Sequence, residues 1–183
     1  PLRAEHLREI GLPILSRTMA LWIARIALLV CLVLHMATAI QLTMQSRQAR
    51  PVPYRVNERL AFSYASYTMR WGGIVILAFV IYHLLHLTTG TMHHRFTDSV
   101  YHNVVSGFQC WPVSLAYIAA MIPLGLHLYH GLWSAFQTLG INNPRFSRWR
   151  RPTALAVSLI IVIGNISIPV AVLTGIVQDV TTK

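Results

Sequence analysis

Two pairs of histidines occur in segments with almost no charge, and the two members of each pair are three residues apart. One pair is His83 and His86, in YHLLHLTTG (82–90), and the other is His127 and His130, in LHLYHGLW (126–133). A neutral imidazole can ligate a metal ion, exchange a proton near neutral pH or hydrogen-bond inside a packed core. At this spacing both members of a pair lie on one face of a helix. The pairs are therefore candidate ligands, with packing as the alternative for each residue.

The segments that carry these histidines are long enough to cross a membrane. Of the 183 residues, 55% are hydrophobic and 11% are charged, where a soluble domain has about 25% charge. Backbone groups in lipid must be satisfied within helices, and about 20 residues span the hydrocarbon layer. We therefore expect an all-α, polytopic transmembrane helix bundle, with residues 1–183 forming a single domain. The expected spans are about 19–45, 70–92, 111–138 and 153–178.

The formal net charge of +10 could indicate nucleic-acid binding, but the arginines gather between the expected spans. Segment 46–70 has five arginines and one acid, and segment 140–152 has four arginines and none. The positive-inside rule then places both segments in the cytoplasm and both termini outside. These loops are either orientation signals alone or also a docking face for an acidic or soluble partner. We expect the bacterial cytoplasmic (inner) membrane, and no nucleic acid.

Ionisable side chains within the expected spans are few, and such groups default to functional hypotheses. No Asp, Glu or Lys occurs there, which disfavours an ion-coupled carrier. The ionisable residues are Arg25, His35, His83, His86, His127 and His130. Counted from the cytoplasmic helix ends, His35, His83 and His127 each lie about 18–20 Å deep, so we expect them at similar levels near the middle of the membrane.

Haem iron accepts axial histidines, and two histidines on facing helices can clamp a porphyrin between them. Two histidines so close on one helix cannot both ligate the same iron axially. One of each pair would ligate, and the other would meet a propionate, a quinone or a side chain that supports the ligands without binding iron. Zinc is a weaker alternative, because neither Cys nor carboxylate accompanies the histidines. Cys31 and Cys110 form no CxxCH motif, so a haem would be held non-covalently.

Other polar residues have two open interpretations each. Arg25 either snorkels to the outer face or pairs with a haem propionate, and Arg70 is either an orientation charge at the start of its helix or a propionate partner. Glu9 is a candidate for quinone-coupled proton exchange, with an ordinary surface carboxylate as the alternative. Three further histidines are expected to be solvated in the outer loop: His93, His94 and His102.

Three stretches together resemble one family, the cytochrome b membrane-anchor subunits of succinate dehydrogenases and quinol:fumarate reductases. The likeness is to the di-haem, single-anchor, b558-type branch, it covers essentially the whole chain, and HxxHGLWSAFQTLG (127–140) is its most specific part. The stretches are LHMATAIQLTMQSRQARP (34–51), RWGGIVILAFVIYHLLHLTTG (70–90) and LGLHLYHGLWSAFQTLGINNPR (124–145).

The resemblance implies two b haems, bound menaquinone, and an iron–sulfur subunit that carries a flavoprotein subunit. It assigns His35 and His127 as axial iron ligands of the haem nearer the cytoplasm, and His83 as a ligand of the haem nearer the outside. It leaves His86 and His130 behind the ligands or facing propionates. It also implies a lipid-embedded electron-transfer subunit that is not catalytic alone, in a complex that could form a higher oligomer.

The sequence departs from the family pattern at its N-terminal end. The family has five spans, and the first carries the partner of His83. Here EHLREIGLP (5–13) looks like the connector that follows that span, so we expect the first span to be missing from this chain. One haem then has both ligands within the chain, and the other has one.

Two other classes of protein stay open from the residues alone. One is another b-type subunit of a quinone-linked oxidoreductase, which HGLWSAFQTLG (130–140) disfavours. The other is a haem-free membrane anchor or small transporter whose histidines pack or relay protons. The chain has no flavin- or phosphate-binding glycine fingerprint, so we do not expect it to oxidise succinate by itself.

Overall fold

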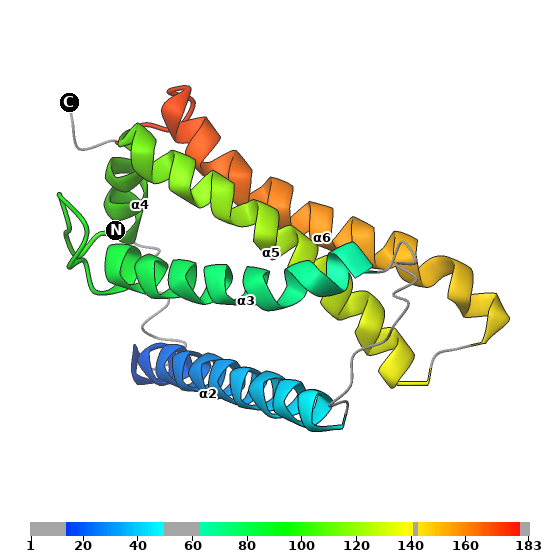
Figure 1. Cartoon of the computed structure of the whole chain (residues 1–183). Helices are drawn as coiled ribbons and strands as arrows, with labels where there is room; N and C mark the ends of the chain where they lie inside the picture. The colour runs from blue at the N-terminus through cyan, green and yellow to red at the C-terminus, as the bar shows by residue number, and fades with distance from the viewer. Residues whose placement is uncertain (1–13, 50–62, 141–142, 180–183) are drawn as a thin grey trace. The chain divides into compact units, whose positions relative to one another are not determined.

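A computed structural model describes residues 14–49, 63–140 and 143–179 of the chain. Within these residues every regular element is a helix, which confirms the all-α prediction (Figure 1). The elements are α2 (Ile14–Gln48), α3 (Ser63–His83), the π-helix η1 (Leu84–Thr88), α4 (Val100–Gln109), α5 (Trp111–Thr138) and α6 (Pro144–Leu173).

Four stretches of helix are long and apolar enough to cross a membrane, as expected from the sequence. Several of their ends differ from the expectation: the first stops at Gln48 rather than near 45, and the second at Thr88 rather than near 92. The fourth runs from Phe146 to Leu173 rather than over 153–178. α3 itself begins at Ser63, so Arg70 lies inside the helix and does not open it. The four stretches are Met19–Gln48, Met69–Thr88, Trp111–Thr138 and Phe146–Leu173.

The chain divides into two compact units, residues 1–58 and 59–183. The structure describes each unit separately, so the expectation that they form a single domain stays a prediction. In the first unit α2 is a helix of 35 residues with exposed aliphatic side chains. Two of its threonines bond within the helix: the Thr38 hydroxyl donates to the Leu34 carbonyl and the Thr43 hydroxyl to the Ala39 carbonyl, both at 2.8 Å. His35 is exposed on this helix.

In the second unit α5 runs antiparallel to both α3 and α6 and packs against each (Figure 1). Small residues allow the close approach that helix packing in membranes requires. A Cβ on Gly125 would lie 2.9 Å from Val162 Cγ2, and the Ser158 hydroxyl donates to the Gly125 carbonyl at 2.7 Å. On the other side, Gly72 of α3 faces Pro123 of α5.

One end of this bundle is closed by α4 and the loop before it. Ser99 caps α4 by accepting from the His102 backbone N–H, and the Ser114 hydroxyl donates to the Phe108 carbonyl at 2.6 Å. The sequence had suggested only a solvated loop here. The difference has a physical reason, since α4 is amphipathic and buries apolar side chains beneath it. The core at this end is formed by Val105, Phe108, Tyr117 and Val172.

Candidate functional site

His86 lies at the centre of a buried cluster of rings at the α4 end of the second unit. Its side chain is fully buried, and its Nδ1 atom lies 3.0 Å from the hydroxyl of Tyr117 on α5. Its ring stacks on Tyr82 at 5.6 Å and on His93 at 4.8 Å between centroids. The ring therefore joins α3, α5 and the loop before α4.

Gly107 of α4 provides the space that this cluster needs. A Cβ at that position would lie 2.8 Å from His86 Cε1 and 3.0 Å from His93 Nε2. The His86 Nε2 atom is buried and has no hydrogen-bond partner among the described residues. Since α4 covers this atom, a porphyrin could reach it only if α4 moved. His86 is thus placed for packing rather than for direct ligation.

His93 is buried, so the expectation that it is a solvated loop residue is wrong. Its Nδ1 accepts the backbone N–H of Arg95 at 3.0 Å, and its Nε2 lies 2.8 Å from the Asn103 carbonyl. These bonds assign the proton to Nε2, and the neutral ring is satisfied on both sides. His102 is half-buried and pairs with Asp179, so its expected solvation is wrong as well.

His94 alone of the three loop histidines is exposed, as expected. Its ring stacks on His93 at 5.3 Å. The pKa of His94 is lowered below its usual 6.5, mainly by partial burial of the ring and to a smaller extent by the neighbouring His93 and Arg95. Its charge therefore appears only in more acidic solution than for a free imidazole.

His83 differs from His86 although it is only three residues away. Its ring is exposed, with Tyr117 at 5.9 Å and Phe79 at 6.2 Å between centroids. The π-helical turn explains part of this difference, because the Thr89 N–H bonds back five residues to the Leu84 carbonyl. The wider turn rotates the residues after His83 relative to α3, and π-turns are frequent at functional sites.

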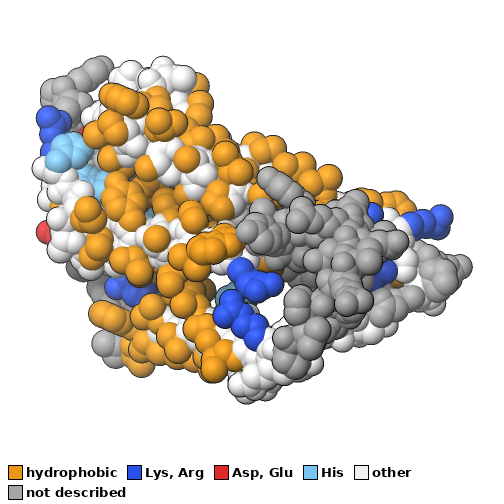
Figure 2. All heavy atoms as spheres, in the orientation of Figure 1, with side chains coloured by type: hydrophobic (Ala, Val, Ile, Leu, Met, Phe, Trp, Pro, Cys, Tyr) orange, Lys and Arg blue, Asp and Glu red, His pale blue; other side chains and the backbone are white. Residues whose placement is uncertain are grey.

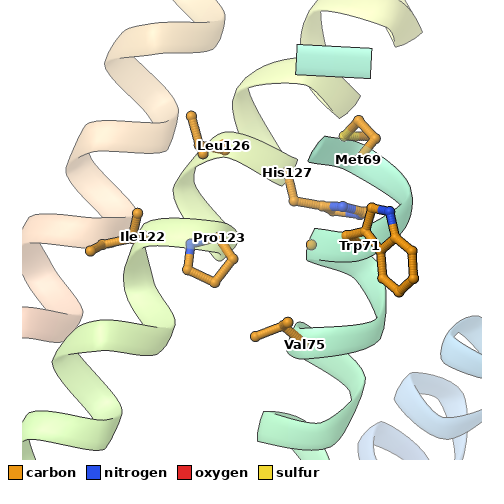
Figure 3. Close-up of a pocket in the computed structure, with 8 residues that line it drawn as sticks. Met69, Trp71, Val75, Ile122, Pro123, Leu126 and His127 are labelled. Atoms are coloured by element: carbon orange, nitrogen blue, oxygen red, sulfur yellow. The ribbon is translucent and has the colours of Figure 1, made fainter. Parts of the chain in front are cut away.

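His127 lines an apolar pocket between α3 and α5, with a volume of about 270 Å³ (Figure 3). In Figure 3 its ring extends from α5 toward Trp71 and Met69 of α3. The volume is just below the roughly 300–1,000 Å³ of typical small-molecule sites. The other lining residues are Gly72, Val75, Ile122, Pro123 and Leu126.

His130, the second histidine of this pair, is buried. Its ring lies 5.4 Å from Tyr129 and 6.3 Å from Trp133, and its Nε2 has no hydrogen-bond partner among the described residues. Both pairs thus show the same division. The first histidine of each pair borders open or apolar surface, and the second is enclosed by protein.

The expectation that His83 and His127 lie at similar depths is wrong. His127 is level with Gly72 on α3, whereas His83 is level with Tyr117 on α5. Eleven residues of helix separate Gly72 from His83, which corresponds to roughly 16 Å along α3. The error came from treating Arg70 and Gly140 as matching helix ends, because α3 starts at Ser63 and α5 continues beyond the level of Arg70.

The remaining candidate residues occupy other places. In α2, the Arg25 guanidinium lies 5.3 Å from the centre of the Trp22 ring. Arg70 is exposed on α3, beside the pocket residues Met69 and Trp71. Glu9 lies outside the described residues, as do 50–62 and 141–142 of the two basic loops.

The side chains are compatible with haem at two of the four histidines of the second unit. His83 is exposed and His127 lines the apolar pocket, whereas His86 and His130 are buried. No group of three or more His, Cys, Asp or Glu placed to hold a metal ion occurs in the described part of the chain. Haem iron needs only two protein ligands, so this finding leaves the haem prediction untouched.

The fold defines the class of protein: an all-helical chain with four helices able to cross a membrane. Comparisons of the chain with protein-family models, with curated proteins and with solved structures found no match.

Tyr117 and Gly107 are contact residues that the sequence alone did not single out. Tyr117 contacts both His83 and His86. It could have been noticed as a tyrosine in an apolar span, since a buried hydroxyl usually has a hydrogen-bond partner. Gly107 carried no signal, because its role depends on a contact with a residue twenty-one positions away.

Proposed function

We propose that this chain is the cytochrome b membrane-anchor subunit of a succinate dehydrogenase or quinol:fumarate reductase. It would carry electrons between an iron–sulfur subunit and membrane menaquinone. The observation that carries the proposal is a difference within each histidine pair: the first histidine borders open or apolar surface, and the second is enclosed by protein. His83 is exposed and His127 lines the apolar pocket, at two levels roughly 16 Å apart, which suits two haems at different depths of a membrane.

In this proposal His127 and His83 would hold the iron of different haems, and the resemblance implies that His35 would hold the same haem as His127. Haem b, when bound, supplies reversible one-electron transfer. The chain would hold each imidazole in place and surround the ring with apolar side chains, among them Trp71 and Val75 at the pocket. Burial of this kind tunes a haem potential by excluding water.

His86 and His130 would not bind iron and would instead support the residues that do. His86 fixes Tyr117, whose ring edge contacts His83, so this pair sets the surroundings of that ligand. The basic segments 46–70 and 140–152 would face the cytoplasm, where the iron–sulfur subunit and its flavoprotein partner dock. The lack of any carboxylate in the four apolar stretches supports electron transfer over ion-coupled transport.

A reduced-minus-oxidised visible spectrum of the detergent-solubilised chain tests the proposal, with haem quantified per polypeptide. We expect a b-type spectrum. About two haems per chain would agree with the full di-haem anchor, and one would agree with an intact His35–His127 site alone. A folded preparation without haem would contradict the proposal.

A second candidate is a haem-free membrane anchor. It is favoured by one observation, the complete burial of His86 in contacts with Tyr82, Tyr117 and His93, which shows that a membrane histidine here can serve packing alone. The same spectrum separates the two candidates.

A further inference from the structure

Near the start of α6, among the side chains that the structure describes, exposed aromatic residues lie beside arginines. Phe146 is 54% exposed and Trp149 is 61% exposed, and Arg148 and Arg151 are exposed beside them. Figure 2 shows Lys and Arg side chains at the end of the molecule where α6 begins, next to hydrophobic side chains. We call Phe146, Arg148, Trp149 and Arg151 the α6 patch.

The side of α6 that packs on α5 is known from two buried residues. Ala154 is 0% exposed and Ser158 is 3% exposed. At about 100° per residue, Trp149 lies roughly 140° around the helix from Ala154, and Arg148 lies roughly 120° from it in the other sense. Both side chains therefore point away from α5 and are available to a partner.

One residue of the patch, Arg151, contacts α5. The Arg151 guanidinium lies 5.5 Å from the centre of the Trp133 ring on α5, a cation–π contact. Arg150 donates from Nη2 to the Ser147 hydroxyl at 3.1 Å. The first contact holds the start of α6 against α5, and the second lies within α6 itself.

The charge of the patch is not balanced by nearby acids. Segment 140–152 contains no Asp or Glu. In the described part of the second unit the two carboxylates are Asp98 and Asp179, and both lie beside α4 at the far end of the α5–α6 pair. The partner that complements the patch is therefore an anion.

The position along α6 indicates which anion. Phe146 is the first residue of the apolar stretch Phe146–Leu173. The exposed side chains of Leu155 and Leu159 lie within about 80° of Arg148 and Arg151 around the helix. Tryptophan and arginine at such a boundary lie at headgroup level in a bilayer. We propose that the α6 patch binds an anionic phospholipid, with its phosphate on Arg148 and Arg151 and its acyl chains along the apolar face of α6.

This proposal does not depend on haem, so it can fail or hold independently of the proposed function. It does compete with one part of that function, because an acidic soluble subunit could also use the arginines. The exposed aliphatic side chains further along α6 favour lipid, since a soluble subunit docked at the start of the helix would leave Leu155 and Leu159 uncovered.

The test uses the purified full chain in a neutral detergent, titrated with phosphatidylglycerol or phosphatidylcholine and examined by native mass spectrometry. We expect the wild type to prefer phosphatidylglycerol, and Arg148→Gln with Arg151→Gln to reduce that preference. The reduction should be about fivefold for each arginine, from about 1 kcal/mol per basic residue near an anionic surface. Arg148→Lys with Arg151→Lys should keep most of it.

Arg95→Gln is the control for each single change, Arg148→Gln or Arg151→Gln, because it likewise removes one positive charge from an exposed position, at the other end of the unit. It should leave the preference unchanged. Equal preferences in the wild type and the double Gln variant would overturn the proposal. It would also be overturned if the variant kept its lipid preference but lost a co-purifying acidic subunit, and the patch would then be a protein interface.

Discussion

The phenol of Tyr117 and the imidazole of His86 meet at 3.0 Å between Oη and Nδ1, and both side chains are buried. Tyr117 comes from the early part of α5, and His86 from the π-turn that follows α3. The same phenol ring lies edge-on to Phe79 at 5.0 Å and to Phe108 at 4.9 Å. One side chain thus joins α3, α4 and α5 around the histidine.

Tyr117→Phe should destabilise the protein by about 1–3 kcal/mol, because it leaves both nitrogens of a buried imidazole without a partner among the described residues. The measurement is the denaturation midpoint of the purified chain in detergent. Tyr129→Phe is the control, since it removes a hydroxyl from a half-buried position on the same helix. Equal midpoints for the two variants would show that the Tyr117 hydroxyl does not stabilise His86.

Gly107→Ala should also destabilise the protein, by about 1–3 kcal/mol, because the added Cβ would lie 2.8 Å from His86 Cε1. The control is Gly164→Ala on α6, where a Cβ would meet nothing within 4 Å. That change should be neutral or slightly stabilising, since Ala restricts the unfolded chain. A neutral Gly107→Ala would mean that the ring cluster yields easily to a methyl group.

The histidine pairs give a prediction about haem content. Under the proposed function, His83→Ala and His127→Ala should each lower the haem-to-polypeptide ratio, because each removes an axial ligand. His130→Gln should largely keep it, since the His130 ring is enclosed by protein. The ratio is measured from the absorbance of the pyridine complex of the extracted haem. Haem loss in His130→Gln with none in His127→Ala would reverse the assignment within that pair.

The four membrane-length helices could be predicted from the sequence because hydropathy and length suffice to define them. The histidine pairs could be predicted for the same reason, since charge and polarity stand out in apolar runs. Which member of a pair is open depended on more than periodicity. The π-turn at Leu84–Thr88 changes the angle between His83 and His86 around the helix axis. No feature of the local sequence predicts this turn.

The α4 region shows why the rest of the site could not be predicted. His93 stands in a polar segment that was expected to be solvated. It is buried because the Asn103 carbonyl and the Arg95 N–H satisfy both of its nitrogens. Those partners become neighbours only when the loop folds back under α4, and such contacts are not encoded by spacing. The depth error for His127 is similar, because relative helix offset is set by packing at Gly72 and Pro123.

The last prediction concerns pH. Partial burial, His93 and Arg95 lower the pKa of His94 below 6.5 in the folded chain. Between that lowered value and 6.5 the unfolded chain binds more protons at this site, so this residue's contribution makes the folded state less stable as the pH falls through that window. The effect on overall stability is small, because His94 is exposed.

The titration of the ring itself is therefore the better measurement. In histidine-labelled protein, the NMR midpoint of His94 should lie below 6.5 and should rise in Arg95→Gln, because removing a neighbouring positive charge favours the imidazolium. It should stay below 6.5, since burial is the larger cause. Arg70→Gln, which changes a charge on α3 beside the His127 pocket, should not move it. An identical His94 midpoint in Arg95→Gln and the wild type would remove Arg95 as a cause of the shift.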